Sequence, residues 1–166
     1  MTYETRIHLS MLSIKLIVIS ELKSGPWKEL QGHYLKLLKP YAHVDLAEIK
    51  PEKFSTPAER DNVLTREATK IRKQIPDGAV IVVLDADGKT SSTETFVRTI
   101  DTLSDGGRTL CFVIGGPLGL SDKIKKEADH RLSLSPMTFP HDFTRVMLLE
   151  QLYRTQTITA GKTYHY

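Results

Sequence analysis

An apolar stretch that ends in a glycine-rich loop is the strongest constraint on the fold of this chain. Residues 110–120 read Leu-Cys-Phe-Val-Ile-Gly-Gly-Pro-Leu-Gly-Leu, and Ser121 with Asp122 then opens a charged, helix-compatible segment. This order predicts a strand, a tight loop and a helix. In open α/β sheets, ligands bind beyond the carboxyl end of such a strand, where glycine lets the backbone approach closely. The loop is therefore a candidate cofactor loop, although a plain strand-to-helix turn also requires glycine.

The rest of the chain alternates between apolar runs and helical patterns. Residues 79–84 are a continuous apolar run and residues 12–19 a mostly apolar one that Lys15 interrupts, as expected for buried parallel strands. Residues 44–49 are expected to form a shorter, half-exposed strand. Thr56-Pro-Ala-Glu59 and Ser91-Ser-Thr-Glu94 are capping boxes that precede helices. Helices are expected over residues 26–39, 56–73, 91–103, 121–129 and 142–159. Strands that alternate with helices predict the α/β class, with a mostly parallel sheet flanked by helices.

Length and composition indicate one soluble domain. The chain has 166 residues, 40% of them hydrophobic and 26% charged, which is enough to bury a core. Its single cysteine, Cys111, is expected to be a small core residue, which agrees with a cytoplasmic location. Residues 12–19 are too short to span a bilayer, so no membrane partner is expected. Residues 1–10 lack a signal-peptide pattern and are expected to be a disordered extension of a domain over residues 11–166.

Two charged features have alternative interpretations. Asp85 and Asp87 are candidate metal ligands, but the nearby Gly88 favours a polar turn, so no metal is expected. The mixed charges of residues 59–73 are expected to form a solvated helix face, with RNA contact as the alternative. The net charge of +3 permits an RNA partner without requiring one.

Four motifs, taken in order, resemble one known family. They are Val-Ile-Gly-Gly-Pro-Leu-Gly-Leu at 113–120, Leu-Ser-Leu-Ser-Pro-Met-Thr-Phe-Pro-His at 132–141, Arg-Val-Met-Leu-Leu-Glu-Gln-Leu-Tyr-Arg at 145–154, and the terminal pair Tyr164 and His165. Together they resemble the RlmH family of bacterial ribosomal RNA large-subunit methyltransferases, members of the SPOUT class. The resemblance covers residues 11–165, with the motifs in family order and spacing.

The resemblance implies a fold, an activity and a cofactor. The expected fold is a SPOUT-type α/β sheet whose C-terminal part forms a deep trefoil knot, and the expected assembly is a homodimer. The expected reaction is methylation of N3 of a pseudouridine in 23S rRNA within the assembled ribosome, with S-adenosyl-L-methionine as the methyl donor. The cofactor contacts carried over by position are Leu84, Gly115, Leu134, Ser135, Pro136, Met137, Thr138 and Phe139.

Five polar residues near these motifs are candidates for catalysis: Arg145, Tyr153, Arg154, Tyr164 and His165. Methyl transfer requires in-line alignment of the attacking nitrogen and loss of the N3 proton. An arginine fork binds phosphate or stabilises a developing anion, whereas a salt bridge with Glu150 is the alternative for both arginines. The terminal tyrosine and histidine are expected to meet the target base in the partner subunit's site, with a frayed terminus as the alternative. His141, which follows Pro140 at a helix start, is a further polar group near the motifs that could assist loss of the N3 proton, but capping or loop support explains it equally well.

Three positions depart from the family pattern. Leu118 lies where members often carry a polar or acidic residue, Ser20 where the first loop commonly has glycine, and Tyr166 where a basic residue often follows. The first two changes are expected to alter loop packing, and the third is expected to weaken a phosphate contact. None of the three removes a cofactor position.

Two other classes of function are compatible with an α/β fold. An enzyme that uses another adenine nucleotide is disfavoured, because the chain has neither Gly-x-Gly-x-x-Gly nor a Walker loop. A non-catalytic ribosome-binding or assembly protein would not need the glycine loop and residues 134–139.

Overall fold

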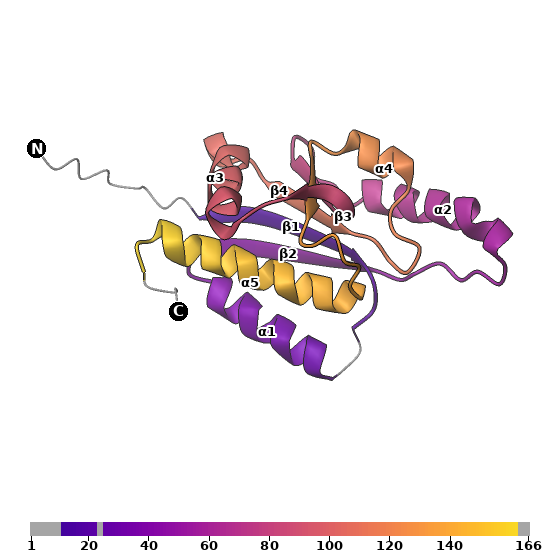
Figure 1. The fold of residues 1–166 in the computed structure, drawn as a ribbon, viewed down its shortest axis with the longest axis horizontal. Coiled ribbons are helices and arrows are strands. Elements are labelled where there is room, and N and C mark those ends of the chain that lie inside the picture. The colour runs from indigo at the N-terminus through magenta and orange to yellow at the C-terminus, as the bar shows by residue number, and fades with distance from the viewer. Residues whose placement is uncertain (1–10, 23–24, 163–166) are drawn as a thin grey trace, which may run out of the picture.

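The computed structural model describes residues 11–22 and 25–162, and its centre is a parallel five-stranded sheet in the order β2-β1-β4-β3-β5 (Figure 1). The strands are β1 Leu12–Ile19, β2 Ala42–Ile49, β3 Val80–Thr90, β4 Leu110–Ile114 and β5 His130–Ser133. The helices are α1 Pro26–Leu38, α2 Arg60–Arg72, α3 Thr93–Leu103, α4 Asp122–Glu127 and α5 His141–Thr159. The predicted α/β class and parallel sheet are therefore confirmed.

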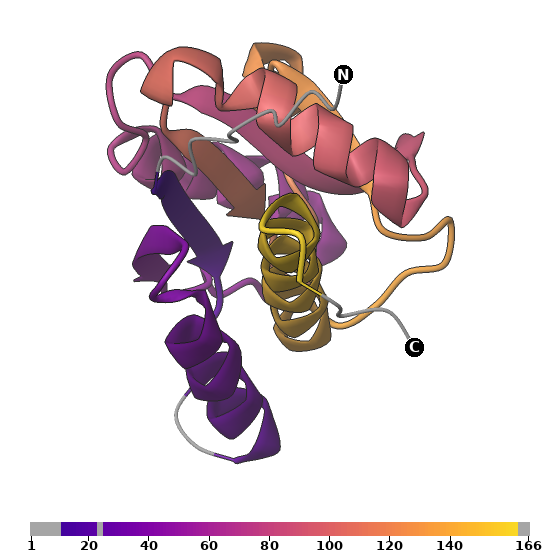
Figure 2. The same cartoon turned by 90° about the vertical axis from the view of Figure 1, so that its left-hand side faces the viewer.

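The helices divide the core into two layers, one on each face of the sheet. α1, α3 and α5 cover one face, where Leu38, Phe96 and Leu149 pack against the strands. α2 and α4 cover the other face around Ile71 and Ile124. Figure 2 shows α5, in yellow, running between α1 and α3. The continuous apolar run of β4 and the mostly apolar sequence of β1 follow from this arrangement, because successive side chains of a strand point to opposite faces and both faces are covered.

The strand order brings several carboxyl ends to one edge of the sheet. Ile114 at the end of β4 is the register partner of Val18 on β1 and of Leu84 on β3. The loops that follow these strands therefore begin side by side. In the strand order, β2 lies on one side of β1, whereas β4 and β3 lie on the other side. The strand order therefore reverses direction at β1, and α/β proteins bind ligands at such a switch point.

Cys111 on β4 is fully buried, as predicted. Burial raises the pKa of its thiol to about 12, against a small opposing effect of the nearby Lys15. The thiol is therefore protonated at neutral pH and serves as a small apolar residue of the core.

The segment after Leu84 differs from the prediction. The sequence predicts a loop at residues 85–89, but β3 continues through them to Thr90 and pairs with β5. Leu84 and Lys89 are both register partners of Leu132, so the residues between them bulge out of the ladder. Gly88 is required within the bulge, because an added Cβ would lie 2.8 Å from the Arg131 carbonyl oxygen. β5 itself is missed by the sequence analysis, because its four residues are too few for a clear pattern.

The two predicted capping boxes mark helix starts but do not form as expected. Thr56 precedes a short 3-10 turn, Pro57–Glu59, and its hydroxyl lies 3.1 Å from the Glu59 carboxylate instead of accepting from a backbone N–H. α3 is capped by Ser92, one residue after the start of the predicted box, and the Ser92 hydroxyl accepts from the Thr95 N–H at 3.2 Å. Each box therefore locates its helix within a few residues, although the hydrogen bonds differ.

Glu67 is the exception to the solvated face predicted for α2. The other charged residues of that helix are exposed, but Glu67 is 4% exposed and accepts a hydrogen bond from the Glu52 backbone N–H at 3.0 Å. Burial raises the pKa of Glu67, so the folded state favours the protonated carboxyl. Relative to an ordinary carboxyl, the contribution of Glu67 to stability is therefore greatest at low pH and is lost as the pH rises through its titration range.

Replacing Glu67 by glutamine is therefore expected to stabilise the protein at neutral pH. The amide keeps an acceptor oxygen for the Glu52 N–H but removes the buried charge. We expect the melting temperature at pH 7 to rise by about 2–4 °C, the shift that about 1 kcal/mol produces in a domain of this size. Thermal unfolding followed by circular dichroism measures the effect. The difference from the native protein should shrink as the pH falls toward 4, and a variant that melts lower at pH 7 would contradict the assignment.

No helix within residues 11–22 and 25–162 is long and apolar enough to cross a bilayer. In the same part of the chain, no group of three or more His, Cys, Asp or Glu side chains is placed to hold a metal ion. The predicted extension at residues 1–10 and the terminal Tyr164, His165 and Tyr166 lie outside the described residues, so the expectations for them stay predictions.

Candidate functional site

A cleft of about 710 Å³ opens at the carboxyl edge of the sheet. Its walls are the end of β3, the loop that follows β4, and residues 134–141, which lead from β5 into α5. Apolar side chains such as Leu84, Ile114 and Phe139 line it together with the backbone of the glycine loop. Its volume lies in the range of small-molecule sites.

The loop after β4 is a tight turn that depends on its glycines. The Gly119 N–H donates to the Gly116 carbonyl at 2.9 Å, and Gly119 has a φ of +78°, which favours glycine. A Cβ on Gly115 would lie 2.6 Å from the Gly119 carbonyl carbon. Gly115 is therefore required by the packing of the loop on itself, in addition to the ligand approach that the sequence predicts.

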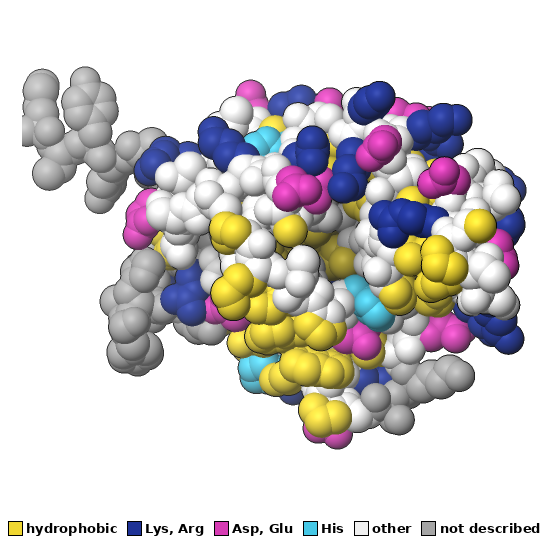
Figure 3. Space-filling model, turned by 45° about the vertical axis from the view of Figure 1, so that its right-hand side comes forward, with side chains coloured by type: hydrophobic (Ala, Val, Ile, Leu, Met, Phe, Trp, Pro, Cys, Tyr) yellow, Lys and Arg dark blue, Asp and Glu magenta, His cyan; other side chains and the backbone are white. Residues whose placement is uncertain are grey.

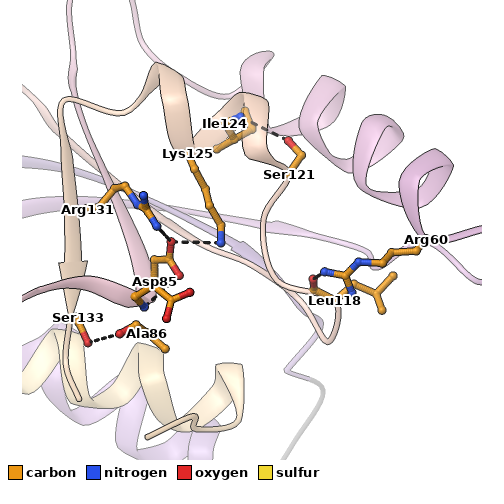
Figure 4. A network of polar contacts seen from close by, with 10 residues as sticks. Arg60, Asp85, Ala86, Leu118, Ser121, Ile124, Lys125, Arg131 and Ser133 are labelled. Carbon is orange, nitrogen blue, oxygen red and sulfur yellow. Dashed lines mark hydrogen bonds and ion pairs between the residues drawn. The ribbon is translucent and has the colours of Figure 1, made fainter. Parts of the chain in front are cut away.

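Hydrogen bonds to backbone carbonyls hold the segments that border the cleft (Figure 4). Arg60 from α2 donates to the Leu118 carbonyl oxygen at the tip of the glycine loop, at 3.1 Å. The Ser133 hydroxyl, at the end of β5, lies 3.0 Å from the Ala86 carbonyl oxygen and 2.9 Å from that of Ser135. These contacts tie each wall of the cleft to a neighbouring element.

An ion-pair cluster borders the cleft at Asp85 on β3. Figure 4 shows Arg131 of β5 and Lys125 of α4 pointing at the Asp85 carboxylate, with N–O distances of 2.6 and 3.1 Å. Burial raises the pKa of Asp85, but the hydrogen bonds from Arg131 and Lys125 outweigh it and hold the pKa below its ordinary value. Asp85 is therefore an ionised carboxylate at neutral pH whose charge is offset by two cations of the chain.

The first turn of α5 brings His141 to the cleft beside a fixed carboxylate, that of Asp142. Asp142 Oδ1 accepts a hydrogen bond from the Ser20 hydroxyl at 2.7 Å. The same oxygen lies 3.5 Å from His141 Nε2 and 3.6 Å from Arg145 Nη2. Ser20, a departure from the family pattern, therefore anchors a carboxylate next to the cleft.

Arg145 is fully buried and joins three elements of the fold. Its Nη1 donates to Gln31 Oε1 of α1 at 2.8 Å and forms an ion pair with Glu48 of β2. Its Nε and Nη2 have no hydrogen-bond partner among the residues that the structure describes. The guanidinium therefore connects α5 to α1 and β2 from within the core.

The predicted cofactor positions gather in the cleft, with one exception. Those that line it are Leu84, Gly115, Leu134, Ser135, Met137, Thr138 and Phe139. Pro136 is not part of the lining. Contact between these residues and a cofactor stays a prediction.

The predicted catalytic residues that the structure describes lie outside the cleft lining. Arg154 pairs with Glu150, at 3.0 Å from Nε and 2.6 Å from Nη2, which is the alternative left open by the sequence. The ion pair of Arg145 is formed with Glu48 instead. The Tyr153 ring packs against the Tyr41 ring with centroids 6.2 Å apart. Tyr164 and His165 lie outside the described residues, so all five catalytic roles stay predictions.

The cleft also contains three ionisable residues, Asp85, Lys125 and His141. Of these, the sequence analysis considers only His141 for the reaction. The sequence places Asp85 in a candidate turn and His141 at the start of a predicted helix. Lys125 has no local signal, because its position depends on how α4 packs against the sheet. Such residues reach the site through tertiary packing, which periodicity does not encode.

Comparison with known proteins places the chain in a family. The profile described as "Predicted SPOUT methyltransferase" matches residues 12–165. The chain belongs to the SPOUT methyltransferase family. Its fold, its cleft and its motif order can therefore be compared with proteins of that family.

Several relatives that match the chain carry the name ribosomal RNA large subunit methyltransferase H, and three of them are described below. The chain is 39% identical to the protein from Clostridium acetobutylicum over 158 residues, which cover 93% of this chain and 99% of the relative. It is 36% identical to that from Listeria monocytogenes, with the same coverage of 93% and 99%. It is 38% identical to that from Caldicellulosiruptor saccharolyticus, over 92% of this chain and 99% of the relative. The predicted family resemblance is thus confirmed.

Solved structures support the fold of this family member. A protein from Haemophilus influenzae Rd KW20, assigned to a methylase family, aligns with a TM-score of 0.60 at 10% identity, over 93% of this chain and 71% of that one. TrmJ from Z. mobilis ZM4 aligns with a TM-score of 0.52 at 12% identity, over 89% and 71%. At such identities the likeness concerns the fold alone.

Proposed function

We propose that this protein methylates N3 of a pseudouridine in 23S rRNA, using S-adenosyl-L-methionine and acting on the assembled ribosome in the cytoplasm. The observation that carries the proposal is the position of the cleft. Residues from three separate segments, represented by Leu84, Gly115 and Leu134, meet in one cavity at the switch point of the sheet. These are positions that the RlmH resemblance assigns to the cofactor, and the relatives that match the chain are named as ribosomal RNA methyltransferases.

The residues of the cleft fit a nucleoside-sized ligand. Leu84, Leu134 and Phe139 provide apolar surface suited to a purine ring, and the glycine loop presents backbone groups without intervening side chains. When bound, S-adenosyl-L-methionine supplies an electrophilic methyl group on a sulfonium. The chain's own task is to hold the donor and the target base in line and to accept a proton. The glycine loop and residues 134–139 would do most of this positioning of the donor.

The proposed assembly is a homodimer, supported by the apolar surface of α1. Trp27 is 38% exposed and Leu30 is 40% exposed, and the Trp27 ring lies 5.3 Å from the Phe143 ring of α5. Figure 3 shows hydrophobic side chains gathered into a band over the lower part of the molecule, where α1 and the start of α5 lie. Contiguous exposed apolar patches of this kind are typical of protein interfaces. The proposed C-terminal trefoil knot rests on membership of the SPOUT family.

A methyl-transfer assay tests the proposal. Purified ribosomes that lack the modification are incubated with the protein and radiolabelled S-adenosyl-L-methionine, with free 23S rRNA as the comparison substrate. We expect label in 23S rRNA from ribosomes and little in free rRNA, at a pseudouridine identified by mass spectrometry. Ribosome binding without transfer would instead indicate a non-catalytic assembly protein. Efficient transfer to free rRNA would contradict the preference for assembled ribosomes.

Removal of residues 164–166 is expected to abolish rRNA methylation while cofactor affinity stays nearly unchanged. The resemblance assigns Tyr164 and His165 to the target base of the partner subunit's site, whereas the cofactor positions that it assigns lie in residues 84–139. Calorimetry with S-adenosylhomocysteine and the ribosome assay measure the two properties on the same truncated protein. Full methylation by that protein would contradict the terminal role.

A further inference from the structure

The ionisable side chains of the described cleft lining are Asp85, Lys125 and His141. Two of them are engaged with each other, because Asp85 pairs with Lys125 and with Arg131. These cations hold the pKa of Asp85 below its ordinary value, which makes its carboxylate a weak proton acceptor. Lys125 faces Asp85 as a cation. Within this lining, His141 is the side chain left to take up a proton.

The position of His141 is set by Asp142, the next residue of α5. Asp142 Oδ1 lies 3.5 Å from His141 Nε2, and the same oxygen accepts from the Ser20 hydroxyl at 2.7 Å. A ring whose Nε2–H faces a carboxylate has its other nitrogen, Nδ1, available as an acceptor. Contacts between catalytic groups are often long in the unliganded site and tighten when substrate binds, so the 3.5 Å separation is compatible with the role.

Capping does not explain the histidine. α5 has Pro140 at its N-cap position, and no side-chain hydrogen bond caps the helix. The side chain of His141 is 27% exposed and lines the cleft, so it is accessible to a ligand. The capping alternative left open by the sequence is therefore without a supporting contact.

We propose that His141 accepts the N3 proton of the target nucleobase and that Asp142 is its positioning residue. This inference rests on the proposed function. The N3–H bond breaks with its proton moving to His141 Nδ1, and its electron pair forms the new bond from N3 to the methyl carbon. The carbon–sulfur bond of the donor breaks, its pair stays on sulfur, and the positive charge of the sulfonium ends on the imidazolium. The imidazolium then releases its proton to water.

The charges around His141 favour this transfer. Arg145 lies 3.6 Å from Asp142, but its charge is offset by its ion pair with Glu48. On the remaining lining, Asp85 is offset by Lys125 and Arg131, as described above. Asp142 is therefore the carboxylate that faces the imidazole of His141. Its negative charge stabilises the imidazolium that forms when the ring takes up the proton.

The test measures single-turnover methylation of ribosomes by the full-length His141→Ala protein. General-base catalysis contributes about 10²–10⁴-fold, so we expect the rate to fall by at least about 100-fold. The affinity for S-adenosylhomocysteine, measured by calorimetry, should stay within about threefold of the native value, because a proton acceptor adds little to ground-state binding. Added imidazole should restore part of the rate, whereas pyrazole, which has a similar shape but is a much weaker base, should not.

Further variants separate a catalytic histidine from a structural one. His141→Gln keeps most of the side-chain volume and a polar end, but the amide is not a base. If the basicity of His141 is required, the methylation rate of this variant should fall as well. Asp142→Asn should lower the rate less than His141→Ala does. In the variant that carries both changes, imidazole should still restore part of the rate. His43→Ala, at an exposed position near the start of β2, is the matched control and should behave as native.

Each outcome decides the proposal. Loss of rate with imidazole-specific rescue supports it. A fully active His141→Gln, a loss of donor affinity that matches the loss of rate, equal rescue by pyrazole, or failure of both His141 variants to fold would overturn it. If the native protein methylates neither ribosomes nor free rRNA, the proposed function fails and this role fails with it. An active native protein with an active His141→Ala variant overturns the role alone.

Discussion

Alanine at position 115 is expected to weaken binding of S-adenosylhomocysteine by about 100-fold, which corresponds to about 2.8 kcal/mol. The added Cβ would lie 2.6 Å from the Gly119 carbonyl carbon and 3.0 Å from the Leu120 backbone nitrogen, and neither backbone atom can move aside as a flexible side chain would. The glycine loop must then open. Overpacking of this kind costs about 1–3 kcal/mol, and each misplaced hydrogen bond to the ligand adds about 0.5–1.5 kcal/mol.

Calorimetry on the Gly115→Ala protein measures the affinity, and circular dichroism verifies that the protein is folded. Gly32→Ala is the matched control, because a Cβ on Gly32, within α1, would meet no atom within 4 Å. We expect the control to bind as the native protein does. Native affinity in Gly115→Ala would contradict the assignment of this loop to the donor site.

Removal of the Arg145 side chain is expected to lower the free energy of unfolding by about 3 kcal/mol, the effect of breaking a buried ion pair. The side chain is fully buried, and its loss would leave the Gln31 amide and the Glu48 carboxylate without their shared partner. It would also leave a cavity where α5 meets α1 and β2, which adds to the cost.

Urea unfolding of Arg145→Ala measures this loss. Arg66→Ala is the comparison, because Arg66 also pairs with a glutamate, Glu52 at 3.0 Å, but its side chain is 50% exposed. Pairs of that kind contribute about 0–1 kcal/mol. Equal losses in the two variants would mean that the buried guanidinium has no special structural role.

The sheet was predictable from the sequence where strands are buried on both faces. β4 and the start of β3 are continuous apolar runs and β1 is mostly apolar, because helices cover both sides of these strands. β5 was not predictable, since its four residues acquire strand geometry from pairing with β3. The bulge after Leu84 has the same origin, because turn residues such as Gly88 also serve a distorted strand.

The candidate site was predictable in outline but not in its polar groups. The glycine loop follows from strand, loop and helix order, whereas residues 134–139 were reached only through the family resemblance. The helical pattern of α5 does not reveal that Arg145 points into the core. Its burial depends on Glu48 and Gln31, which lie 97 and 114 residues away in the sequence. Pairings over such distances are products of tertiary packing.

The contact between Arg60 and the glycine loop gives the departure at Leu118 a simple meaning. Arg60 donates to the backbone carbonyl oxygen of residue 118, at 3.1 Å, so this hydrogen bond does not involve the side chain of that residue. Every amino acid has that oxygen, so this hydrogen bond forms with leucine as readily as with the polar or acidic residue that the family resemblance leads us to expect there. The residue that donates this hydrogen bond, Arg60, lies 58 positions earlier in the sequence, on α2. A change at Arg60, outside the four family motifs, would remove this hydrogen bond, while a change at Leu118 inside the motif would leave it in place.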